Sequence, residues 1–363
     1  MQLIKGLLMP FVLLGLTSLG YALSENDPCT NPAGKLGRCI FFRECEPILN
    51  IYRKTIVTPE ESIFIDKSRC GKRTDGKPLV CCTGDSGRKQ TTSTSLLPKT
   101  PFCGASLGER IHGGQPTLLD EYPWTALIEY RKPNGRTGFH CGASLINSRY
   151  VVTAAHCIQA IPRSWTVAGV RLGEWDLDQE RDCLDGDCAD APLNMSIDKI
   201  IVHEDYDPQS KAQYNDIALI RFTRDVIMTS FISPICLPID NAQRSRNIVG
   251  TKGMAAGWGR TENATTSHLK LKVELEFKEL KSCSNTYKPS GVILRDTQMC
   301  AGGVRGKDTC SGDSGGPLMK QITANNYLYG IVSFGPNKCG TKGVPGVYTN
   351  VAKYIDWIES KLE

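Results

Sequence analysis

Sixteen cysteines constrain the fold of this 363-residue chain more than any other feature. The chain starts with Lys5, an apolar stretch over residues 6–19 and the small-residue site Gly20-Tyr21-Ala22, a pattern typical of an export signal at residues 1–22. A membrane anchor is the alternative, but the apolar run is short and residues 24–27 are polar. We therefore expect a secreted, extracellular protein whose cysteines form disulfides, because a zinc cluster would need reduced ligands.

The cysteines fall into two groups. Six of them lie within residues 28–82, which predicts a disulfide-rich module too small to rely on a hydrophobic core. Spacing alone leaves fifteen possible pairings open for these six. Residues 83–110 follow as a linker and activation segment, rich in Ser, Thr, Lys and Gly up to residue 100, and we expect this linker to be exposed and flexible.

The residue pattern of the sequence changes at residue 111. Short β-branched and aromatic runs now alternate with Gly, Pro, Asn and Asp turns, which favours an all-β sandwich or barrel. The predicted strands are 124–130, 150–153, 217–222, 254–257, 328–334 and 346–349. Residues 351–362 carry apolar side chains at helical spacing and predict one C-terminal amphipathic helix.

Composition and charge exclude several functions. A net charge of +5 without a dense Lys/Arg block does not predict a nucleic-acid partner. No segment after the export signal is long and apolar enough to predict a membrane span. The sequons at Asn194 and Asn263 fit an extracellular glycoprotein, although a sequon permits glycosylation without ensuring it.

The strongest chemical signal is Ser314, which lies in the sequence GDSGGP at residues 312–317. Flanking glycines let a backbone approach the reacting carbonyl, so this serine suits a nucleophile. The motif also matches the G-x-S-x-G turn of α/β-hydrolases, in which the histidine follows the serine. All five histidines of this chain precede Ser314, which favours the chymotrypsin order: His112, His140, His156, His203 and His268.

Two further residues complete a candidate triad. His156 ends the apolar run 151–155 and is followed by Cys157, which a disulfide could anchor. Asp216 precedes the apolar run 217–220, where a buried carboxylate would need a partner. Taken singly, each could be structural, a core histidine and a strand-capping aspartate. Together with Ser314 they predict a Ser-His-Asp site.

These motifs resemble those of the chymotrypsin/trypsin family over residues 111–363, and residues 28–82 resemble an arthropod clip domain. Sequence phrases at 169–176 and 296–303 place the chain in the clip-protease branch. The resemblance implies two six-stranded antiparallel β-barrels with a C-terminal helix, after a small disulfide-rich clip domain. It also implies a trypsin-like serine endopeptidase, a hydrolase.

Roles for the site residues follow from the same resemblance. Ser314 would attack the scissile carbonyl, His156 would transfer the proton, and Asp216 would orient the imidazole. The main-chain N–H groups of Gly312 and Ser314 would form the oxyanion hole. Ser333 would add a hydrogen bond near Asp216.

The resemblance also implies a substrate pocket for Arg or Lys. Asp308, six residues before Ser314, would lie at the pocket floor and attract a basic side chain. Gly335 and Gly346 would form its walls beside Ser333. The alternative for Asp308 is a surface position with no role.

Activation would follow from cleavage between Arg110 and Ile111. The new ammonium group of Ile111 would pair with Asp313 and order the oxyanion hole and the pocket. Because the cut follows Arg, the expected partners are an upstream trypsin-like activating protease and, after activation, a serpin inhibitor.

The family resemblance assigns all sixteen cysteines to pairs. A bond between Cys103 and Cys236 would keep the clip domain attached to the protease domain after cleavage. The pairs are Cys29–Cys81, Cys39–Cys70, Cys45–Cys82, Cys141–Cys157, Cys183–Cys188, Cys283–Cys300, Cys103–Cys236 and Cys310–Cys339.

An acidic loop at 174–182 predicts a structural calcium site, because clustered oxygen ligands suit this ion. The position matches the calcium loop of trypsin-like proteases. Expected ligands are the side chains of Glu174, Asp176 and Asp182 and the carbonyl of Gln179. The alternative is a solvated acidic loop without metal.

The function that we expect is a zymogen protease in an extracellular cascade of innate immunity or embryonic patterning. Its protein substrate could be Spätzle, the Toll-ligand precursor, or a component of prophenoloxidase-driven melanisation. Two rivals are a non-catalytic clip-domain adaptor and a broad digestive trypsin. The presence of His156, Asp216 and Ser314 argues against the first, and the clip module against the second.

Overall fold

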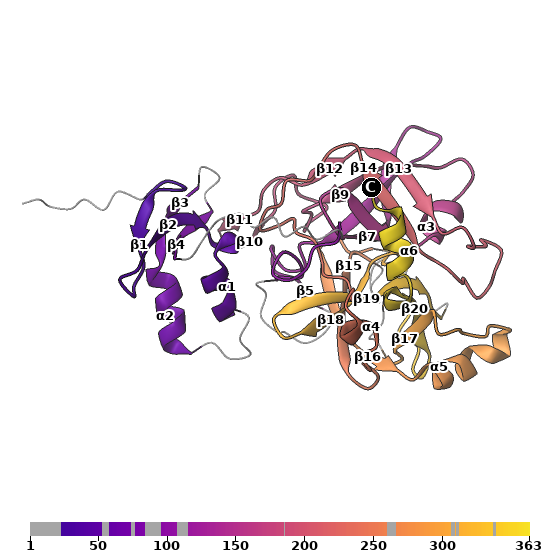
Figure 1. The fold of residues 1–363 in the computed structure, drawn as a ribbon. Helices are drawn as coiled ribbons and strands as arrows, with labels where there is room; N and C mark the ends of the chain where they lie inside the picture. The colour runs from indigo at the N-terminus through magenta and orange to yellow at the C-terminus, as the bar shows by residue number, and fades with distance from the viewer. Residues whose placement is uncertain are drawn as a thin grey trace, which may run out of the picture. The chain divides into compact units, whose positions relative to one another are not determined.

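The computed structural model describes residues 23–52, 58–73, 77–83, 96–106, 115–184, 186–259, 266–305, 309, 312–336 and 339–363. The chain divides into two compact units, one of residues 1–52 and 56–88 and one of residues 53–55 and 89–363 (Figure 1). The expected export signal and the Arg110–Ile111 cleavage site lie outside the described residues. Within the described ranges, no helix has the length and apolar composition of a membrane span.

The first unit is a four-stranded antiparallel sheet with two helices. Its strands run in the order β1 (Pro28–Thr30), β2 (Leu36–Phe41), β4 (Pro78–Cys82) and β3 (Arg69–Lys72). A 3₁₀ turn, η1 (Phe42–Glu44), leads into α1 (Glu46–Tyr52), and α2 (Pro59–Lys67) follows. Thr58 caps the N-terminus of helix α2. Its hydroxyl accepts from the N–H of Glu61 and the Glu61 carboxylate accepts from the N–H of Thr58, which satisfies two N-terminal donors.

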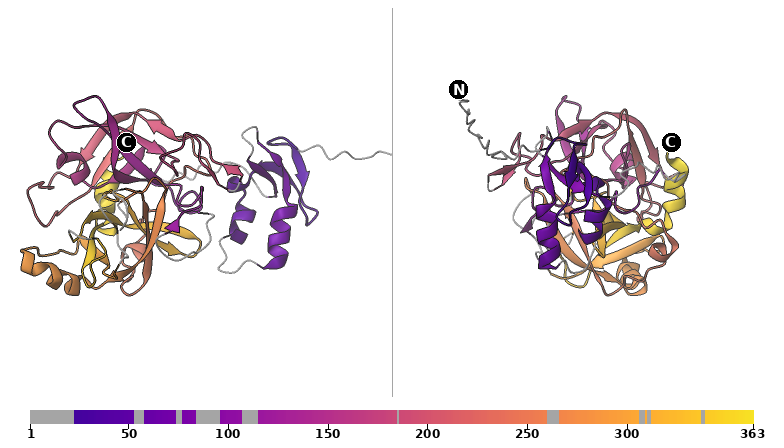
Figure 2. Two further views of the ribbon diagram at one scale, coloured as in Figure 1. Left: turned by 180° about the vertical axis from the view of Figure 1, so that it is seen from behind. Right: turned by 60° about the vertical axis from the view of Figure 1, so that its left-hand side comes forward.

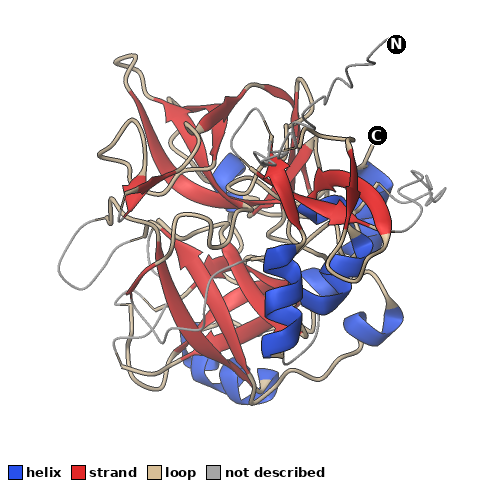
Figure 3. Cartoon of the chain, turned by 90° about the vertical axis from the view of Figure 1, so that its left-hand side faces the viewer, coloured by secondary structure: helices blue, strands red, loops and turns tan. Residues whose placement is uncertain are grey.

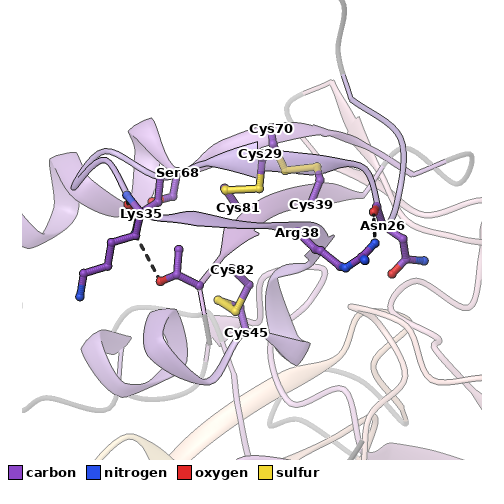
Figure 4. The surroundings of a disulfide bond; sticks show 12 residues. Asn26, Cys29, Lys35, Arg38, Cys39, Cys45, Ser68, Cys70, Cys81 and Cys82 are labelled. Atoms are coloured by element: carbon purple, nitrogen blue, oxygen red, sulfur yellow. Dashed lines mark hydrogen bonds between the residues drawn. A yellow bond between two sulfur atoms is a disulfide. The ribbon is translucent and has the colours of Figure 1, made fainter. Parts of the chain in front are cut away.

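Three disulfides take the place of a large core in this unit. They are Cys29–Cys81, Cys39–Cys70 and Cys45–Cys82, the pairs that the family resemblance implies (Figure 4). Cys39 and Cys45 are fully buried. Each bond closes a loop in the unfolded chain and lowers the entropy of that chain, which stabilises the fold by about 4 kcal/mol for loops of this size.

The second unit contains two β-barrels (Figure 3). In the first, the strand order is β12-β9-β6-β7-β8-β14-β13, all antiparallel. The bounds are β6 (Thr125–Arg131), β7 (Thr137–Leu145), β8 (Tyr150–Thr153), β9 (Thr166–Leu172), β12 (Leu193–Met195), β13 (Ile197–Val202) and β14 (Ala218–Phe222). Strand β12 extends the edge of a six-stranded barrel.

The second barrel is closed by pairing of β15 with β16. Its order is β15-β18-β19-β20-β17-β16, and the short strand β5 (Gln115–Pro116) joins β16 from outside. The bounds are β15 (Lys252–Gly257), β16 (Leu271–Lys278), β17 (Gln298–Gly302), β18 (Pro317–Ile322), β19 (Asn325–Phe334) and β20 (Pro345–Asn350). The two barrels expected from the sequence are therefore confirmed, each with one added strand.

The predicted C-terminal helix is confirmed but starts later than expected. The chain first forms a 3₁₀ turn, η3 (Val351–Lys353), and then the helix α6 (Ile355–Lys361). Helix α6 is the yellow helix next to the C-terminus in Figure 2. Tyr354 separates the two, because its backbone leaves the helical region. Its hydroxyl donates to Asn215 at 2.9 Å. The spacing of apolar residues is preserved, so Ile355 and Ile358 still pack into the core with Val151.

Short elements and four disulfides complete the described part of this unit. The remaining elements are α3 (His156–Gln159), β10 (Cys183–Leu184), β11 (Asp187–Cys188), α4 (Asn241–Arg244), α5 (Leu280–Tyr287) and η2 (Lys288–Ser290). The expected pairs Cys103–Cys236, Cys141–Cys157, Cys183–Cys188 and Cys283–Cys300 are present. Cys310, of the expected Cys310–Cys339 pair, lies outside the described residues.

Candidate active site

His156 is placed by the end of strand β8. The chain leaves β8 at Thr153, turns, and starts the short helix α3 at His156. The Cys141–Cys157 disulfide ties this turn to β7, and the Tyr130 hydroxyl donates to the carbonyl of Cys157 at 2.9 Å. These bonds fix the backbone that carries the imidazole.

Asp216 holds His156 at two points. The Nδ1 atom of His156 lies 2.8 Å from Oδ2 of Asp216, and the His156 main-chain N–H donates to Oδ1 at 2.8 Å. Asp216 is completely buried, and the Ser333 hydroxyl also donates to its Oδ2, at 2.5 Å. The buried charge is thus satisfied by three donors, as a stable buried carboxylate requires.

The pKa of His156 is shifted by this environment. Burial alone would lower it, but the charge of Asp216 and its hydrogen bond outweigh burial and raise the pKa above its ordinary value. The pair therefore stabilises an imidazolium, which is the species that forms when a histidine accepts a proton from a nucleophile.

The Ser314 segment packs against the same turn. The N–H of Gly142 on β7 donates to the carbonyl of Ser314 at 2.8 Å. A Cβ on Gly315 would collide with the Thr153 hydroxyl and the Gly142 carbonyl, so only glycine fits there. Thr153 ends β8 of the first barrel, three residues before His156, and Ser314 precedes β18 of the second barrel. The serine and histidine segments therefore lie together where the two barrels join.

The expected pocket walls face each other. A Cβ added to Gly335 would lie 3.9 Å from the Cα of Gly346, an ordinary contact distance, so the two glycines are neighbours, as the expected pocket requires. We call the expected pocket between these two glycines the slot. Ser333, expected in the pocket, directs its hydroxyl at Asp216. Asp308, the expected floor, lies outside the described residues.

Asp313 occupies a niche lined by glycines. Its Oδ1 accepts from the N–H of Gly259 at 2.9 Å. A Cβ on Gly257 would stand only 2.5 Å from the same oxygen, so the close approach needs glycine. The expected partner, Ile111, lies outside the described residues.

The acidic loop places two carboxylates in the interior. Glu174 and Asp182 are buried, and both accept from the N–H of Trp175, at 3.0 and 2.8 Å. Burial raises the pKa of each, and the repulsion of Asp182 adds to the shift at Glu174 although Arg171 pairs with Glu174 at 3.0 Å. Arg171 and the buried Lys270 interact with these carboxylates and offset part of their charge. Carboxylates are the ligands that calcium prefers, so the loop offers ligands of the right kind, and the calcium site stays a prediction.

His268 contacts the acidic loop, although the sequence analysis did not associate this residue with it. Its Nδ1 lies 2.8 Å from Oδ1 of Asp176 and 3.7 Å from Oδ2 of Asp178. The Gln179 side-chain amide donates to the other Asp176 oxygen at 2.7 Å. Burial opposes the shift, but the bonds from His268, the Asp178 N–H and Gln179 lower the pKa of Asp176. No motif links His268 to the loop, because it is 92 residues away.

Of the two glycosylation sequons, the structure describes the one at Asn194. Asn194 is exposed on β12, and its Oδ1 accepts from Arg171 at 2.9 Å. Asn263 lies outside the described residues.

A histidine held by a buried aspartate, beside a serine loop between two antiparallel barrels, defines a serine protease of the chymotrypsin type. The sequence model of the Trypsin family matches residues 111–358, and that of the regulatory CLIP domain of proteinases matches residues 29–82. The chain belongs to the trypsin family of serine proteases and carries a clip domain.

Relatives of the same two-domain kind cover nearly the whole chain. CLIP domain-containing serine protease B4 of Anopheles gambiae is 56% identical over 94% of this chain and 93% of that protein. Serine protease ea (Easter) of Drosophila melanogaster is 44% identical over 92% of this chain and 91% of that protein, which confirms the expected branch. The solved Drosophila Grass clip protease of the Toll pathway has a TM-score of 0.64 at 32% identity, covering 92% and 97% of the two chains.

Proposed function

We propose that this protease is secreted as an inactive precursor and, after one cut at Arg110–Ile111, hydrolyses extracellular proproteins after Arg or Lys. The observation that carries the proposal is the doubly bonded His156–Asp216 pair beside the Ser314 loop. A non-catalytic adaptor has no need of a buried carboxylate that raises the basicity of an imidazole. A digestive enzyme has no need of the clip domain.

The proposed reaction has two balanced halves. Ser314 Oγ attacks the scissile carbonyl carbon as its proton moves to Nε2 of His156, and the oxyanion accepts bonds from the N–H groups of Gly312 and Ser314. Collapse breaks the C–N bond, and the amine leaves with the proton from His156. Water then attacks the acyl ester by the same route and restores Ser314.

Substrate selection in this proposal rests on the slot between Gly335 and Gly346. The slot admits a long unbranched side chain, and Asp308 at its base would pair with a guanidinium or ammonium group. The glycine-lined niche around Asp313 supports the proposed pairing of Asp313 with the ammonium group of Ile111. Because Arg110 precedes the cut, a trypsin-like enzyme would activate the precursor, and a serpin would end its activity.

The biological substrate has two candidates. Relatives at similar identity are named Spaetzle-processing enzyme (41%) and Melanization protease 1 (40%), both from Drosophila melanogaster. The candidates are accordingly the Spätzle precursor of Toll signalling and a proprotein of the melanisation cascade.

The acidic loop and the sequons enter the proposal as accessory sites. Glu174, Asp176, Asp182 and the carbonyl of Gln179 would hold calcium, which would offset the buried negative charge and stiffen the loop. Asn194 and Asn263 would carry N-linked glycans.

The test is to cleave the purified full chain at Arg110 and offer it both candidate proproteins. N-terminal sequencing of the products should show one new end following Arg or Lys, and Ser314→Ala should give none. Asp308→Ser should abolish Arg-ester hydrolysis while Ser314 still reacts with a small phosphonylating agent. Retained Arg preference in that variant would overturn the pocket assignment.

A further inference from the structure

The hairpin between β6 and β7 and the loop after α3 are rich in cations. Together they contain Arg131, Lys132, Arg136 and Arg163, of which the three arginines are exposed. Residues 131–140 and 156–166 contain no Asp or Glu. We refer to these four residues as the basic rim.

An aromatic shelf supports the rim. The Lys132 ammonium lies 4.8 Å from the centre of the Trp165 ring, and that ring lies 4.5 Å from the ring of His140. A cation over an indole face is attracted by it, so the contact restrains Lys132 on the shelf. Burial and the charge of Lys132 lower the pKa of His140, so its ring adds apolar surface at neutral pH.

The aromatic shelf that supports Lys132 lies close to the nucleophile. Gly142, whose N–H holds the Ser314 carbonyl, is two residues from His140 along β7, about 7 Å at strand spacing. Cys141 is also bonded to Cys157, next to His156. The His140 end of the shelf therefore lies near Ser314 and His156, on the first barrel.

The proposed function sets the direction in which a substrate would pass the shelf. In that proposal, the slot of Gly335 and Gly346 on the second barrel takes the side chain before the cleaved bond. The chain beyond the bond would then leave Ser314 on the side of the first barrel, where β7 and α3 lie.

We propose that Arg131, Lys132, Arg136 and Arg163 bind acidic side chains of protein substrates on the carboxyl side of the cleaved bond. This inference rests on the proposed endopeptidase function and adds the substrate class. The hairpin of β6, β7 and the turn between them has one acidic residue, Glu129, against three cations, Arg131, Lys132 and Arg136. An exposed ion pair contributes a factor of about 1.5 to 5 in affinity, and several pairs act together.

The test compares quenched-fluorescent peptides that are identical up to Arg and differ beyond it, Asp and Glu in one and Asn and Gln in the other. The activated full chain should cleave the acidic peptide about tenfold faster in kcat/KM at low salt, from two or more such pairs. The advantage should shrink in about 1 M salt, where the screening length falls to about 3 Å.

Two variants and a matched control locate the effect. Arg136→Glu should reduce the acidic advantage, and Lys132→Glu with Arg136→Glu should abolish it. Arg224→Glu is the matched control. Asp216 lies just before the start of β14, and Arg224 lies just after its other end, away from the catalytic residues. Equal cleavage of both peptides by the unmodified enzyme, or an advantage kept by the double variant, would overturn the inference.

An Arg p-nitroanilide, which has no residue beyond the bond, separates this inference from the function on which it rests. All four proteins should cleave it equally. If the unmodified enzyme cleaves the nitroanilide but does not distinguish the peptides, only the basic rim is wrong. If it cleaves nothing after activation, the endopeptidase function and the rim both fall.

Discussion

The ammonium group of Lys272 donates to both carboxylate oxygens of Glu121 at 2.7 Å, and both side chains are almost fully buried. Lys272 belongs to β16, which pairs with β5 just after the activation segment. Glu121 also accepts from the N–H of Leu118 at 3.1 Å. The pair therefore fastens the start of the protease region to the second barrel.

Lys272→Met should destabilise the protein strongly. It leaves the Glu121 carboxylate buried without its cation, which costs about 3–5 kcal/mol, and urea unfolding at neutral pH measures the loss. Adding Glu121→Leu should restore most of the stability. Lys252→Met is the control, since the Lys252–Glu274 pair is exposed on the lysine side and should contribute less than about 1 kcal/mol. A loss below about 1 kcal/mol for Lys272→Met would contradict the assignment.

Asp216→Asn should leave the fold intact and remove most of the activity. The amide cannot stabilise an imidazolium and favours the wrong tautomer, so kcat should fall about 10⁴-fold, as is known for this change in the chymotrypsin-type triad. Turnover of an Arg ester by the activated chain measures the loss. Far-ultraviolet dichroism should be unchanged, and a kcat within tenfold of the original would remove Asp216 from the catalytic group.

The pH dependence of kcat/KM should report the raised pKa of His156. The histidine must be neutral to accept the proton of Ser314, so activity should rise with pH through a midpoint above 6.5, the ordinary value. The same shift favours the folded state at low pH, and this contribution disappears as pH rises through the folded pKa. Rates on an Arg ester between pH 5 and 9, a range spanning the histidine titration, give the midpoint. A midpoint below 6.5 would contradict the effect of Asp216.

Gly335→Val should close the substrate slot without disturbing the barrel. The first added carbon makes an ordinary contact with Gly346, but the branched side chain fills the space that an Arg substrate needs. We expect kcat/KM for an Arg ester to fall about 100-fold. Reaction of Ser314 with a small phosphonylating agent should keep its rate, and a parallel loss of both would indicate a misfolded site instead.

Calcium should raise the thermal midpoint of the purified chain. Binding to the folded state alone stabilises it by about 2.7 kcal/mol when the ion is present at 100 times its Kd. Differential scanning calorimetry in calcium, in chelator and in magnesium measures the shift, which should be absent in Glu174→Gln. Identical midpoints in calcium and chelator would exclude the site.

Several elements could be predicted because their signals are local. The run 150–153 coincides with β8, and 217–222 overlaps β14 except for its first residue. The C-terminal helix was predicted correctly but begins later than expected, after Tyr354, whose backbone is not helical and whose hydroxyl bonds to Asn215, 139 residues away. Helical spacing carries no information about such a distant partner.

The buried lysines show the same limit. In 269–277, Leu, Val and Phe alternate with Lys and Glu, so Lys270 and Lys272 would be assigned to the water side of a strand. Both are about 2% exposed, and burial lowers the pKa of Lys270 to about 8 although nearby carboxylates oppose the shift. The segment that covers these lysines begins at β5, more than 150 residues earlier in the sequence. A local sequence pattern therefore cannot predict that they are buried.

The Cys103–Cys236 disulfide joins a residue before the proposed cut at Arg110–Ile111 to one well after it. Hydrolysis at Arg110 would accordingly produce a two-chain molecule of unchanged mass, save one added water. Whatever surface captures the clip domain would also retain the active protease, so proteolysis would be confined to the place where the precursor had docked.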